Sequence, residues 1–432
     1  MSTASEQTIG MLEEVVQPVG VGTNLGLVHR LWTIMSGAFL VSRGALFPAL
    51  QRAGFSAEQS RRAGQALRQG VWSIAPLLAA FRARVEREGV WQPTRYEGDV
   101  PVAADVTVFW RPRLQGGLGK FYQRLANRAV SGIGVGLVVQ VGRVGAQRLP
   151  LLKQLVRPLE AARSDQGLQQ QVLRAAARQL GPDEVLVYDA GASVAEMQAA
   201  VVARYGVRRA RNCTARRNCL PERPAGKGRP REYGQLVRPL ARQHKGRRLA
   251  ATAPDQVTTF QFQERLIPAQ GWHGLVRADQ KVAPDQPHFS IWLFTDPLYR
   301  EPLVVATNLS ASPATIFGCY HDRWPVEQVP LVAKQLLGLQ RHFVFAPTSC
   351  QRLPELALLT ANILTYLAAL LPPITTGFWD RAPSRTPGRL RRHLAQEGFS
   401  RTFPSAGRLR EKAAVTDHLP KGVAAHRRHK AA

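Results

Sequence analysis

The spacing of apolar residues changes at about residue 99, and this change limits the folds that the chain can adopt. The stretch DVPVAADVTVFWRP (99–112) alternates β-branched and small residues over a short run that a proline closes, which predicts a strand. Residues 134–152 predict two more strands joined at a glycine-containing turn. Further along, helices over 165–181 and 194–206 alternate with strands over 183–193 and 207–215. This order predicts a mixed α/β sheet flanked by helices.

The first hundred residues have helical periodicity instead. Ser56 is placed to cap a helix, with Gln59 at the capping-box position and Phe55 as a hydrophobic staple. A break at Gly70 divides this stretch into two helices. The pair fits either a helix-turn-helix that reads DNA or a plain helical hairpin packed on its own core. We expect an N-terminal helical, DNA-binding domain over 1–98.

The composition changes again at about residue 219, where Pro, Gly and Arg dominate before strand patterns return without a helix between them. We interpret 219–300 as a β-rich insertion that divides the α/β core into a first part, 99–218, and a second part, 301–375. The remaining residues, 376–432, form a basic C-terminal tail. From Trp379 onward the tail has 13 Lys and Arg against four Asp and Glu.

Three features could suggest other classes of protein, and none fits well. The glycines of GIGVG (132–136) are not followed by a helix in a dinucleotide-binding context, so we interpret them as turn residues. Cys213 and Cys219 lack a second ligand pair at zinc-site spacing, and four cysteines in 432 residues suggest a reducing compartment. The apolar run 356–373 is interrupted by Thr and Asn and predicts a buried core helix. With no signal peptide, we expect a cytoplasmic protein without membrane contact.

The charge of the chain favours polyanionic partners. The formal net charge is +28, and 49 of the 58 basic residues are Arg, whose planar fork matches phosphate oxygens. Residues 204–248 carry 15 Arg and Lys against two acidic residues, a local net charge of 15 − 2 = +13. This segment is either a solvated loop or a DNA-backbone surface, and GC-rich codon usage is a further source of Arg. Its candidate DNA contacts are Arg209, Arg211, Arg216 and Arg217.

Two aspartates lie where a hydrolytic or strand-transfer site could use them. Asp105 is inside the strand VAADVTVF, where a charge is costly without a compensating partner. Asp189 follows the hydrophobic run EVLVY at a glycine turn, the usual place for a site at the carboxyl ends of strands. Taken singly, each is more often a structural residue.

The stretch YHDRWPVEQVPLVAK (320–334) places Tyr320, Arg323, Glu327 and Lys334 at the spacing Y-(2)-R-(3)-E-(6)-K. In one regular helix all four would lie within an arc of about 60°. Pro325 prefers the first turn of a helix, so Tyr320 and Arg323 could belong to a preceding turn. The pattern alone also fits the polar stripe of an ordinary amphipathic helix.

This spacing resembles the signature of the YREK subgroup of DDE transposases of bacterial insertion sequences, and all four positions match. HDRWPVE is similar to the family's R-W-x-[IV]-E core, KQLLGLQRH to its K-x-x-x-G continuation, and LVVATNL to the preceding strand. AADVT and VYDAGAS resemble the segments around the first and second catalytic aspartates, in the right order. The resemblance covers about residues 100–370.

The resemblance implies a ribonuclease H-like catalytic domain, with Asp105 on the first strand, Asp189 on the fourth and Glu327 on a helix after a β-rich insertion. These three carboxylates would hold two Mg²⁺ or Mn²⁺ ions. Water would free a 3′-hydroxyl at the transposon end, and this hydroxyl would attack target DNA. Arg323 and Lys334 would neutralise phosphate charge, and Tyr320 would donate a hydrogen bond to a phosphate oxygen.

The implied partners are double-stranded DNA, as the element's terminal inverted repeats and as target, and a second copy of the chain in a synaptic homodimer. A bacterial, nucleoid-associated cytoplasmic location follows. The strand EPLVVATNL lacks the aromatic on which some relatives stack a flipped base, and Trp292 and Tyr299 are the available substitutes, so we do not expect a hairpin route of excision. The alternatives are a catalytically inactive or domesticated DNA-binding relative and a structural RNA- or ribosome-associated protein.

Overall fold

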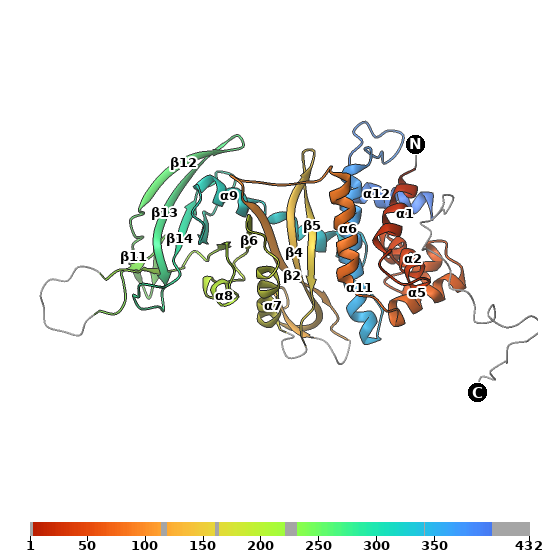
Figure 1. Ribbon diagram of the computed structural model, residues 1–432, viewed down its shortest axis with the longest axis horizontal. Helices are drawn as coiled ribbons and strands as arrows, with labels where there is room; N and C mark the ends of the chain where they lie inside the picture. The colour runs from red at the N-terminus through yellow and green to blue at the C-terminus, as the bar shows by residue number, and fades with distance from the viewer. Residues whose placement is uncertain (1–2, 114–118, 160–163, 221–230, 341, 400–432) are drawn as a thin grey trace, which may run out of the picture. The chain divides into compact units, whose positions relative to one another are not determined.

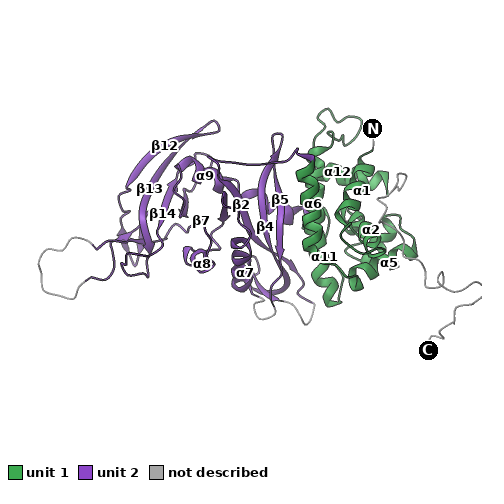
Figure 2. Ribbon diagram, viewed as in Figure 1, with its two compact units in different colours: residues 1–87, 333–432 green, residues 88–332 purple. Residues whose placement is uncertain are grey.

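The computed structural model describes residues 3–113, 119–159, 164–220, 231–340 and 342–399 (Figure 1). The chain forms two compact units (Figure 2). Unit 1 combines residues 1–87 with 333–432, and unit 2 contains residues 88–332. The sequence-based division placed a boundary at 98/99 and kept the residues beyond 332 apart from the N-terminal helices. Residues 400–432 of the predicted basic tail lie outside the described residues.

Unit 1 is helical. Its elements are α1 (Ala4–Val15), α2 (Thr23–Met35), α3 (Ala38–Val41), α4 (Leu46–Arg52), α5 (Ala57–Gln69), α6 (Ile74–Glu88), α11 (Pro347–Leu370) and α12 (Pro387–Glu397). The predicted start of α5 is confirmed, because Ser56 and Gln59 form a reciprocal capping box. The predicted break is confirmed too, since Gly70 caps the carboxyl end of α5.

Helix α11 contains the apolar run that the sequence predicted to be a buried helix. It is the one helix of the described residues that is long and apolar enough to cross a membrane by length and composition, with a mean hydropathy of 1.5. However, 94% of its most apolar window is buried inside the protein, and it packs against α2, α5 and α12. This burial is typical of a core helix, as predicted.

Unit 2 is built on a mixed sheet of 13 strands in the order β1-β4-β2-β6-β7-β15-β14-β13-β8-β9, with β3 and β5 paired to β4 and β12 paired to β13. The strands of its first half are β1 (Gln92–Pro93), β2 (Val100–Trp110), β3 (Gly119–Gln123), β4 (Arg128–Val144), β5 (Gln147–Val156), β6 (Glu184–Tyr188) and β7 (Tyr205–Arg208). Those of its second half are β8 (Ala215–Arg217), β9 (Leu236–Val237), β12 (Gln256–Phe262), β13 (Arg265–Arg277), β14 (Phe289–Phe294) and β15 (Leu303–Thr307). The predicted mixed α/β class is confirmed.

The helical segments that accompany this sheet in the described residues are α7 (Asp165–Ala177), α8 (Val194–Ala199), α9 (Pro313–His321), the 3₁₀-helix η2 (Trp324–Glu327) and α10 (Gln328–Leu331). The prediction of a helix over 194–206 is wrong beyond Ala199, because Val201 adopts a positive φ of 56° and Tyr205 already begins β7. The predicted strand 207–215 is divided between β7 and β8.

The interpretation of GIGVG as turn residues is also wrong, because these glycines lie inside β4. They are needed for close packing instead. A Cβ atom on Gly136 would lie 2.0 Å from Val172 Cγ2 of α7, and one on Gly134 would lie 2.4 Å from the Phe121 ring. The turn between β4 and β5 is formed at Gly145, which has a φ of 56°.

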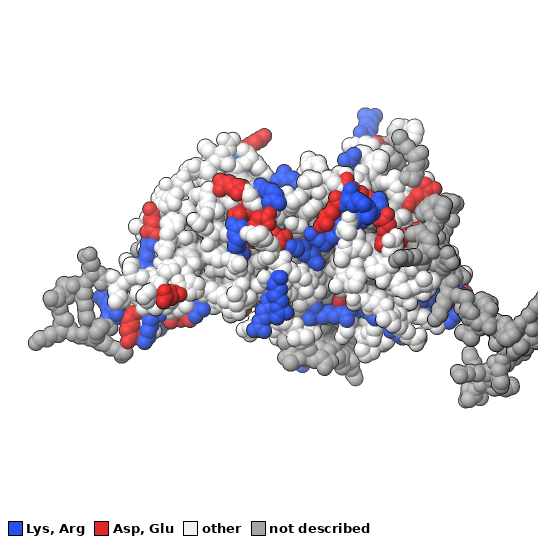
Figure 3. All heavy atoms as spheres, in the orientation of Figure 1, with Lys and Arg blue, Asp and Glu red and all other residues white. Residues whose placement is uncertain are grey.

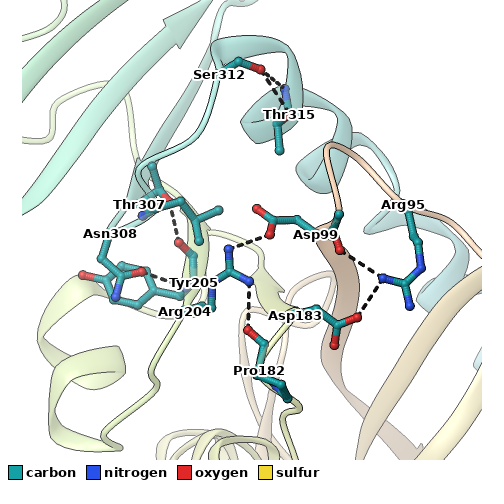
Figure 4. Close-up of polar contacts among 12 residues, drawn as sticks. Arg95, Asp99, Pro182, Asp183, Arg204, Tyr205, Thr307, Asn308, Ser312 and Thr315 are labelled. Carbon is teal, nitrogen blue, oxygen red and sulfur yellow. Dashed lines mark hydrogen bonds and ion pairs between the residues drawn. The ribbon is translucent and has the colours of Figure 1, made fainter.

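Strands β2, β6 and β7 run parallel, and polar contacts fasten their amino-terminal ends (Figure 4). Arg204 Nη2 lies 2.5 Å from Asp99 Oδ1, and Arg204 Nη1 donates to the carbonyl oxygen of Pro182 at 3.1 Å. Arg95 Nη1 pairs with Asp183 Oδ2 at 2.8 Å. With these ends fixed, the register of the three strands is defined at their opposite, carboxyl ends.

Candidate active site

The strand register brings Asp105 and Asp189 together. Asp105 lies on β2, where Ala103 is paired in parallel with Val187 of β6. Two residues further along both strands, this register places Asp189 beside Asp105. In-register neighbours on parallel strands point to the same face of the sheet, so both carboxylates lie on one face.

Arg208 joins this row from the next strand. Tyr188 at the end of β6 is paired with Val207 of β7, so one more residue places Arg208 beside Asp189. Arg208 is close enough to Tyr320 to lower the pKa of its hydroxyl, although burial raises that pKa overall. The row therefore contains two carboxylates and a guanidinium on three adjacent strands.

The row faces away from α7. Val102 and Ala104 of β2 belong to the core cluster that also contains Leu168 and Val172 of α7. Asp105 has the opposite parity and points to the other face, where α9 and η2 lie against β2. The same face carries a second core cluster that includes Tyr320.

Asp105 is the most perturbed carboxylate of the site. Burial raises its pKa to about 6, and the negative charges of Asp189 and Glu327 add to this effect. The Val106 N–H donates to Asp105 Oδ1 at 2.8 Å and Arg323 is near, and both lower the pKa without cancelling the rise. The protein therefore stabilises the ionised form of Asp105 less than water does.

The signature segment forms a corner rather than one regular helix. Tyr320 is in α9, Arg323 is in the turn that follows, Glu327 ends η2, and Lys334 is in a π-helical turn (Val332–Leu336). The projection of all four onto a 60° arc therefore does not apply. Pro325 in the first turn of η2 is the physical reason, since proline cannot continue α9 but fits the start of a new helical turn.

Three of the four signature residues lie in unit 2, at the site. Arg323 Nη2 donates to Glu327 Oε1 at 2.7 Å, with the Arg323 side chain 13% exposed and Glu327 45% exposed. The Arg323 guanidinium also lies over the Tyr320 ring, 5.9 Å from its centroid. Burial lowers the pKa of Arg323, but Tyr320, Glu327 and Asp189 raise it, and the net direction is upward.

Lys334 belongs to unit 1, where it lines a hollow of about 340 Å³. The other lining residues are Phe39, Leu40, Arg43, Gln335, Gly338 and Gln340. Gly338 closes the hollow with a positive φ of 75°, and a Cβ atom there would meet Leu40 Cδ2 at 2.8 Å. The hollow thus combines two cations, two amides and an apolar wall.

A buried carboxylate, Asp322, holds the corner in place. Arg148 Nη1 of β5 donates to Asp322 Oδ1 at 3.1 Å and lies 2.9 Å from His321 Nδ1. Burial raises the pKa of Asp322, but hydrogen bonds from His321, Arg148 and Tyr96 outweigh it and the pKa is lowered. Gly318 allows this arrangement, because a Cβ atom there would lie 2.4 Å from the Tyr96 ring.

The side chains Asp105, Asp189 and Glu327 supply the oxygen donors that Mg²⁺ and Mn²⁺ prefer. Within the part of the chain that the structure describes, no three His, Cys, Asp or Glu side chains lie close enough together to form a complete metal-binding group. Glu327 is held by Arg323. The raised pKa of Asp105 nevertheless fits a site whose charge a cation would compensate.

Most of the predicted DNA-binding arginines in 204–248 make contacts within the protein. Arg216 donates to the carbonyl oxygens of Ala278 and Gly234 at 2.8 and 2.9 Å. Arg217 forms a bidentate pair with Asp255. Arg211 Nη1 pairs with Glu301 Oε1 at 2.9 Å on the surface. Arg209 is half-buried beside Cys213 and lowers the pKa of that thiol, which burial raises overall.

A different part of the same segment exposes its cations. Strands β10 (Arg242–His244) and β11 (Arg247–Leu249) form a separate two-stranded hairpin. The turn residues Lys245 and Gly246 both have positive φ, 47° and 73°, as a tight hairpin turn requires. Lys245, Arg247 and Arg248 are exposed, and their side chains pair with no carboxylate among the described residues. On the face of the molecule that Figure 3 shows, Lys and Arg side chains are interspersed with Asp and Glu.

The two aromatic substitutes for base stacking have opposite surroundings. Trp292 is 3% exposed and stacks on Phe294 in the core, so it cannot receive a base without unfolding that cluster. Tyr299 is exposed in the loop between β14 and β15. The structure thus removes Trp292 as a candidate.

Two residues of the site were missed by sequence reasoning. Arg208 could have been found, because it ends the strand next to Asp189 in a parallel sheet. Asp322 lies inside the signature segment, but its partner Arg148 is 174 positions away along the chain and leaves no local signal. In comparisons with known proteins, no family model matches the sequence, and no curated protein is similar enough to count as a relative.

Proposed function

We propose that the chain is a metal-dependent DNA transposase of the DDE type, with a ribonuclease H-like catalytic core in unit 2. The observation that carries the proposal is the row of Asp105 and Asp189 on adjacent parallel strands, on the face covered by the Tyr320–Glu327 corner. The signature spacing and the net charge of +28 support the same conclusion.

Asp105, Asp189 and Glu327 are the residues that would hold two Mg²⁺ or Mn²⁺ ions. When bound, such ions activate an attacking oxygen and stabilise the leaving oxygen at a phosphodiester. Glu327 would bind an ion through Oε2, or through both oxygens after its Oε1 leaves the Arg323 guanidinium.

The neighbouring side chains would bind the scissile phosphate. Arg323 would exchange the Glu327 carboxylate for a phosphate oxygen, and Arg208 would add a second positive charge from β7. The Tyr320 hydroxyl keeps its proton at neutral pH, because a phenol is protonated there at its ordinary pKa and burial raises that pKa further, and so it would donate a hydrogen bond to the phosphate. Lys334 and the β10–β11 hairpin would contact the DNA backbone.

The test is nicking of a supercoiled plasmid that carries the gene with several hundred base pairs of its flanking DNA. We expect the full chain to nick this plasmid in Mg²⁺ or Mn²⁺ but not in EDTA, and to nick a plasmid without the flanking DNA much less. Binding of the flanking DNA without any nicking would contradict the proposal and favour a catalytically inactive DNA-binding relative.

A further inference from the structure

Two neighbouring aromatic side chains protrude from unit 1 in the loop between α11 and α12. Phe378 is 93% exposed and Trp379 is 83% exposed. Their ring centroids lie 5.2 Å apart with an interplanar angle of 86°. Several other tryptophans of the chain, such as Trp32 and Trp272, are fully buried. Two adjacent large aromatics leave a continuous apolar area in water, which a bound partner would cover favourably.

The base of this loop is held by several hydrogen bonds. The exposure of the two aromatics is therefore a feature of an ordered loop. Ile374 and Ser384 form an antiparallel bridge across its neck. The Asp380 carboxylate accepts hydrogen bonds from the Thr376 N–H and hydroxyl, both at 2.9 Å, and from the Ala382 N–H at 3.1 Å. These contacts fix the backbone on both sides of the exposed pair.

Arg389 of α12 completes the base. Its Nη1 atom donates to Asp380 Oδ2 at 2.6 Å and to the Ile374 carbonyl oxygen at 2.7 Å. The one acidic residue of the loop is thereby neutralised. Arg381 and Arg385, which follow the aromatic pair in the same loop, are both exposed. The loop therefore presents aromatic faces in a positively charged setting.

We propose that Phe378 and Trp379 form a stacking site for unpaired nucleobases of single-stranded nucleic acid. Successive bases stack on aromatic side chains while nearby cations contact the phosphates, and each stacked base contributes about 1–3 kcal/mol. This proposal goes beyond the proposed function, since it concerns a binding site in unit 1 and needs no metal or strand cleavage.

The size of the patch favours nucleobases over a protein partner. Two aromatic side chains supply about 300–500 Å² of contact surface. A stable protein interface needs about 800 Å² on each side. The residues next to Phe378 and Trp379 in the sequence are Thr376, Gly377, Asp380 and Arg381, which are polar, glycine or charged. A flat base is small enough to cover it.

The experiment measures binding of the full chain, in EDTA, to a fluorescein-labelled 12-nucleotide oligothymidine by fluorescence anisotropy. We expect the double variant Phe378→Ala/Trp379→Ala to bind this strand about 10- to 100-fold more weakly than the wild type. Affinity for a duplex of equal length should change less than about twofold. Phe345→Ala, which removes another exposed aromatic of unit 1, is the matched control and should bind like the wild type.

Two further measurements separate stacking from a structural role. Trp379→Phe keeps a stacking surface and should retain most of the affinity, while losing the quenching of tryptophan fluorescence by the bound strand. Equal affinity of the double variant and the wild type for the single strand would overturn the proposal. So would a change of oligomeric state in the double variant with unchanged affinity, which would assign the loop to self-association. Neither result affects the nicking test of the proposed function.

Discussion

Two carboxylates of unit 2, the fully buried Asp322 and the half-buried Asp105, show how differently the same protein treats a negative charge. Asp322 is fully buried, and hydrogen bonds from His321, Arg148 and Tyr96 lower its pKa despite its burial. The pKa of Asp105 is raised to about 6, mainly by burial and additionally by the negative charges of Asp189 and Glu327. Each lies in or next to the corner that contains Arg323.

Under the proposed function, this contrast separates a structural carboxylate, Asp322, from a catalytic one, Asp105. A buried charge that supports the fold can be compensated by the fold, as Asp322 is by Arg148 at its Oδ1 atom. Asp105 has like charges beside it, and among the described residues one backbone N–H, that of Val106, is seen to donate to it. We infer that its compensation comes from outside the chain, which is the reason to regard it as a metal ligand. The predictions below test this difference.

The largest expected effect is on catalysis at Asp105. Asp105→Asn keeps the shape of the side chain but removes the charge, so we expect plasmid nicking to fall by at least about 10³-fold. Binding to the same DNA, measured by gel shift in EDTA, should change less than about threefold. Nicking at the wild-type rate would falsify the role of Asp105.

The counterpart is Asp322→Ala, which removes the buried carboxylate from Arg148, whose side chain is 32% exposed. Arg148 can still reach water and His321, so the cost should lie below that of a fully buried pair, and we expect the free energy of unfolding in urea to fall by about 1–3 kcal/mol. Asp183→Asn is the control, because its partner Arg95 is exposed, and it should cost less than about 1 kcal/mol. A loss equal to that of the control would mean that Asp322 does not hold the corner.

The pH dependence of stability should differ between wild type and Asp105→Asn. The folded chain binds the Asp105 proton more tightly than the unfolded chain, whose pKa is about 3.8, so this group lowers stability as the pH rises from about 4 to about 6. At pH 7 the full cost is present and corresponds to at most about 3 kcal/mol. Asp105→Asn should therefore be more stable than the wild type at pH 7 and nearly equal at pH 3.5.

Urea unfolding at several pH values, with and without Mn²⁺, measures this difference. Mn²⁺ should raise the stability of the wild type at pH 7 and leave Asp105→Asn nearly unchanged. If the stabilities of the two proteins differ by a constant amount from pH 3.5 to 7, the pKa of Asp105 is not raised in the folded chain.

The smallest expected effect concerns the basic segment 204–248. Arg217 is paired within the protein, as Asp322 is, whereas the exposed cations of the β10–β11 hairpin pair with no carboxylate among the described residues. Arg247→Ala/Arg248→Ala removes two exposed cations, so the slope of log affinity for DNA against log salt should fall by about 2. Arg217→Ala should leave that slope unchanged and instead lower stability, since it breaks the pair with Asp255. A smaller salt slope for Arg217→Ala, with an unchanged slope for the double variant, would mean that Arg217 contacts the DNA and the hairpin does not.

Local patterns in the sequence predicted the helix caps and strands that depend on interactions between residues close together in the chain. The cap at Ser56, the strand around Asp105 and the strand before Asp189 all follow from short-range spacing, and the structure has them. Predicting that Asp105 and Asp189 lie side by side also requires the strand order, because β2 and β6 are parallel neighbours in the sheet.

Long-range packing decided the rest. The glycines of β4 are explained only by the close approach of α7, and the use of Arg217 only by Asp255, which is 38 positions away along the chain. The corner at Pro325 was visible in the sequence as a weakness of the single-helix reading, but its anchoring by Arg148 was not.

The central claim is that Asp105 and Asp189 form a metal site, and a Mn²⁺ titration followed by electron paramagnetic resonance tests it most directly. The wild type and Asp183→Asn should bind Mn²⁺ with the same stoichiometry at pH 7, whereas Asp105→Asn and Asp189→Asn should each lose the tightest site. Identical Mn²⁺ binding by Asp105→Asn and the wild type would contradict the claim.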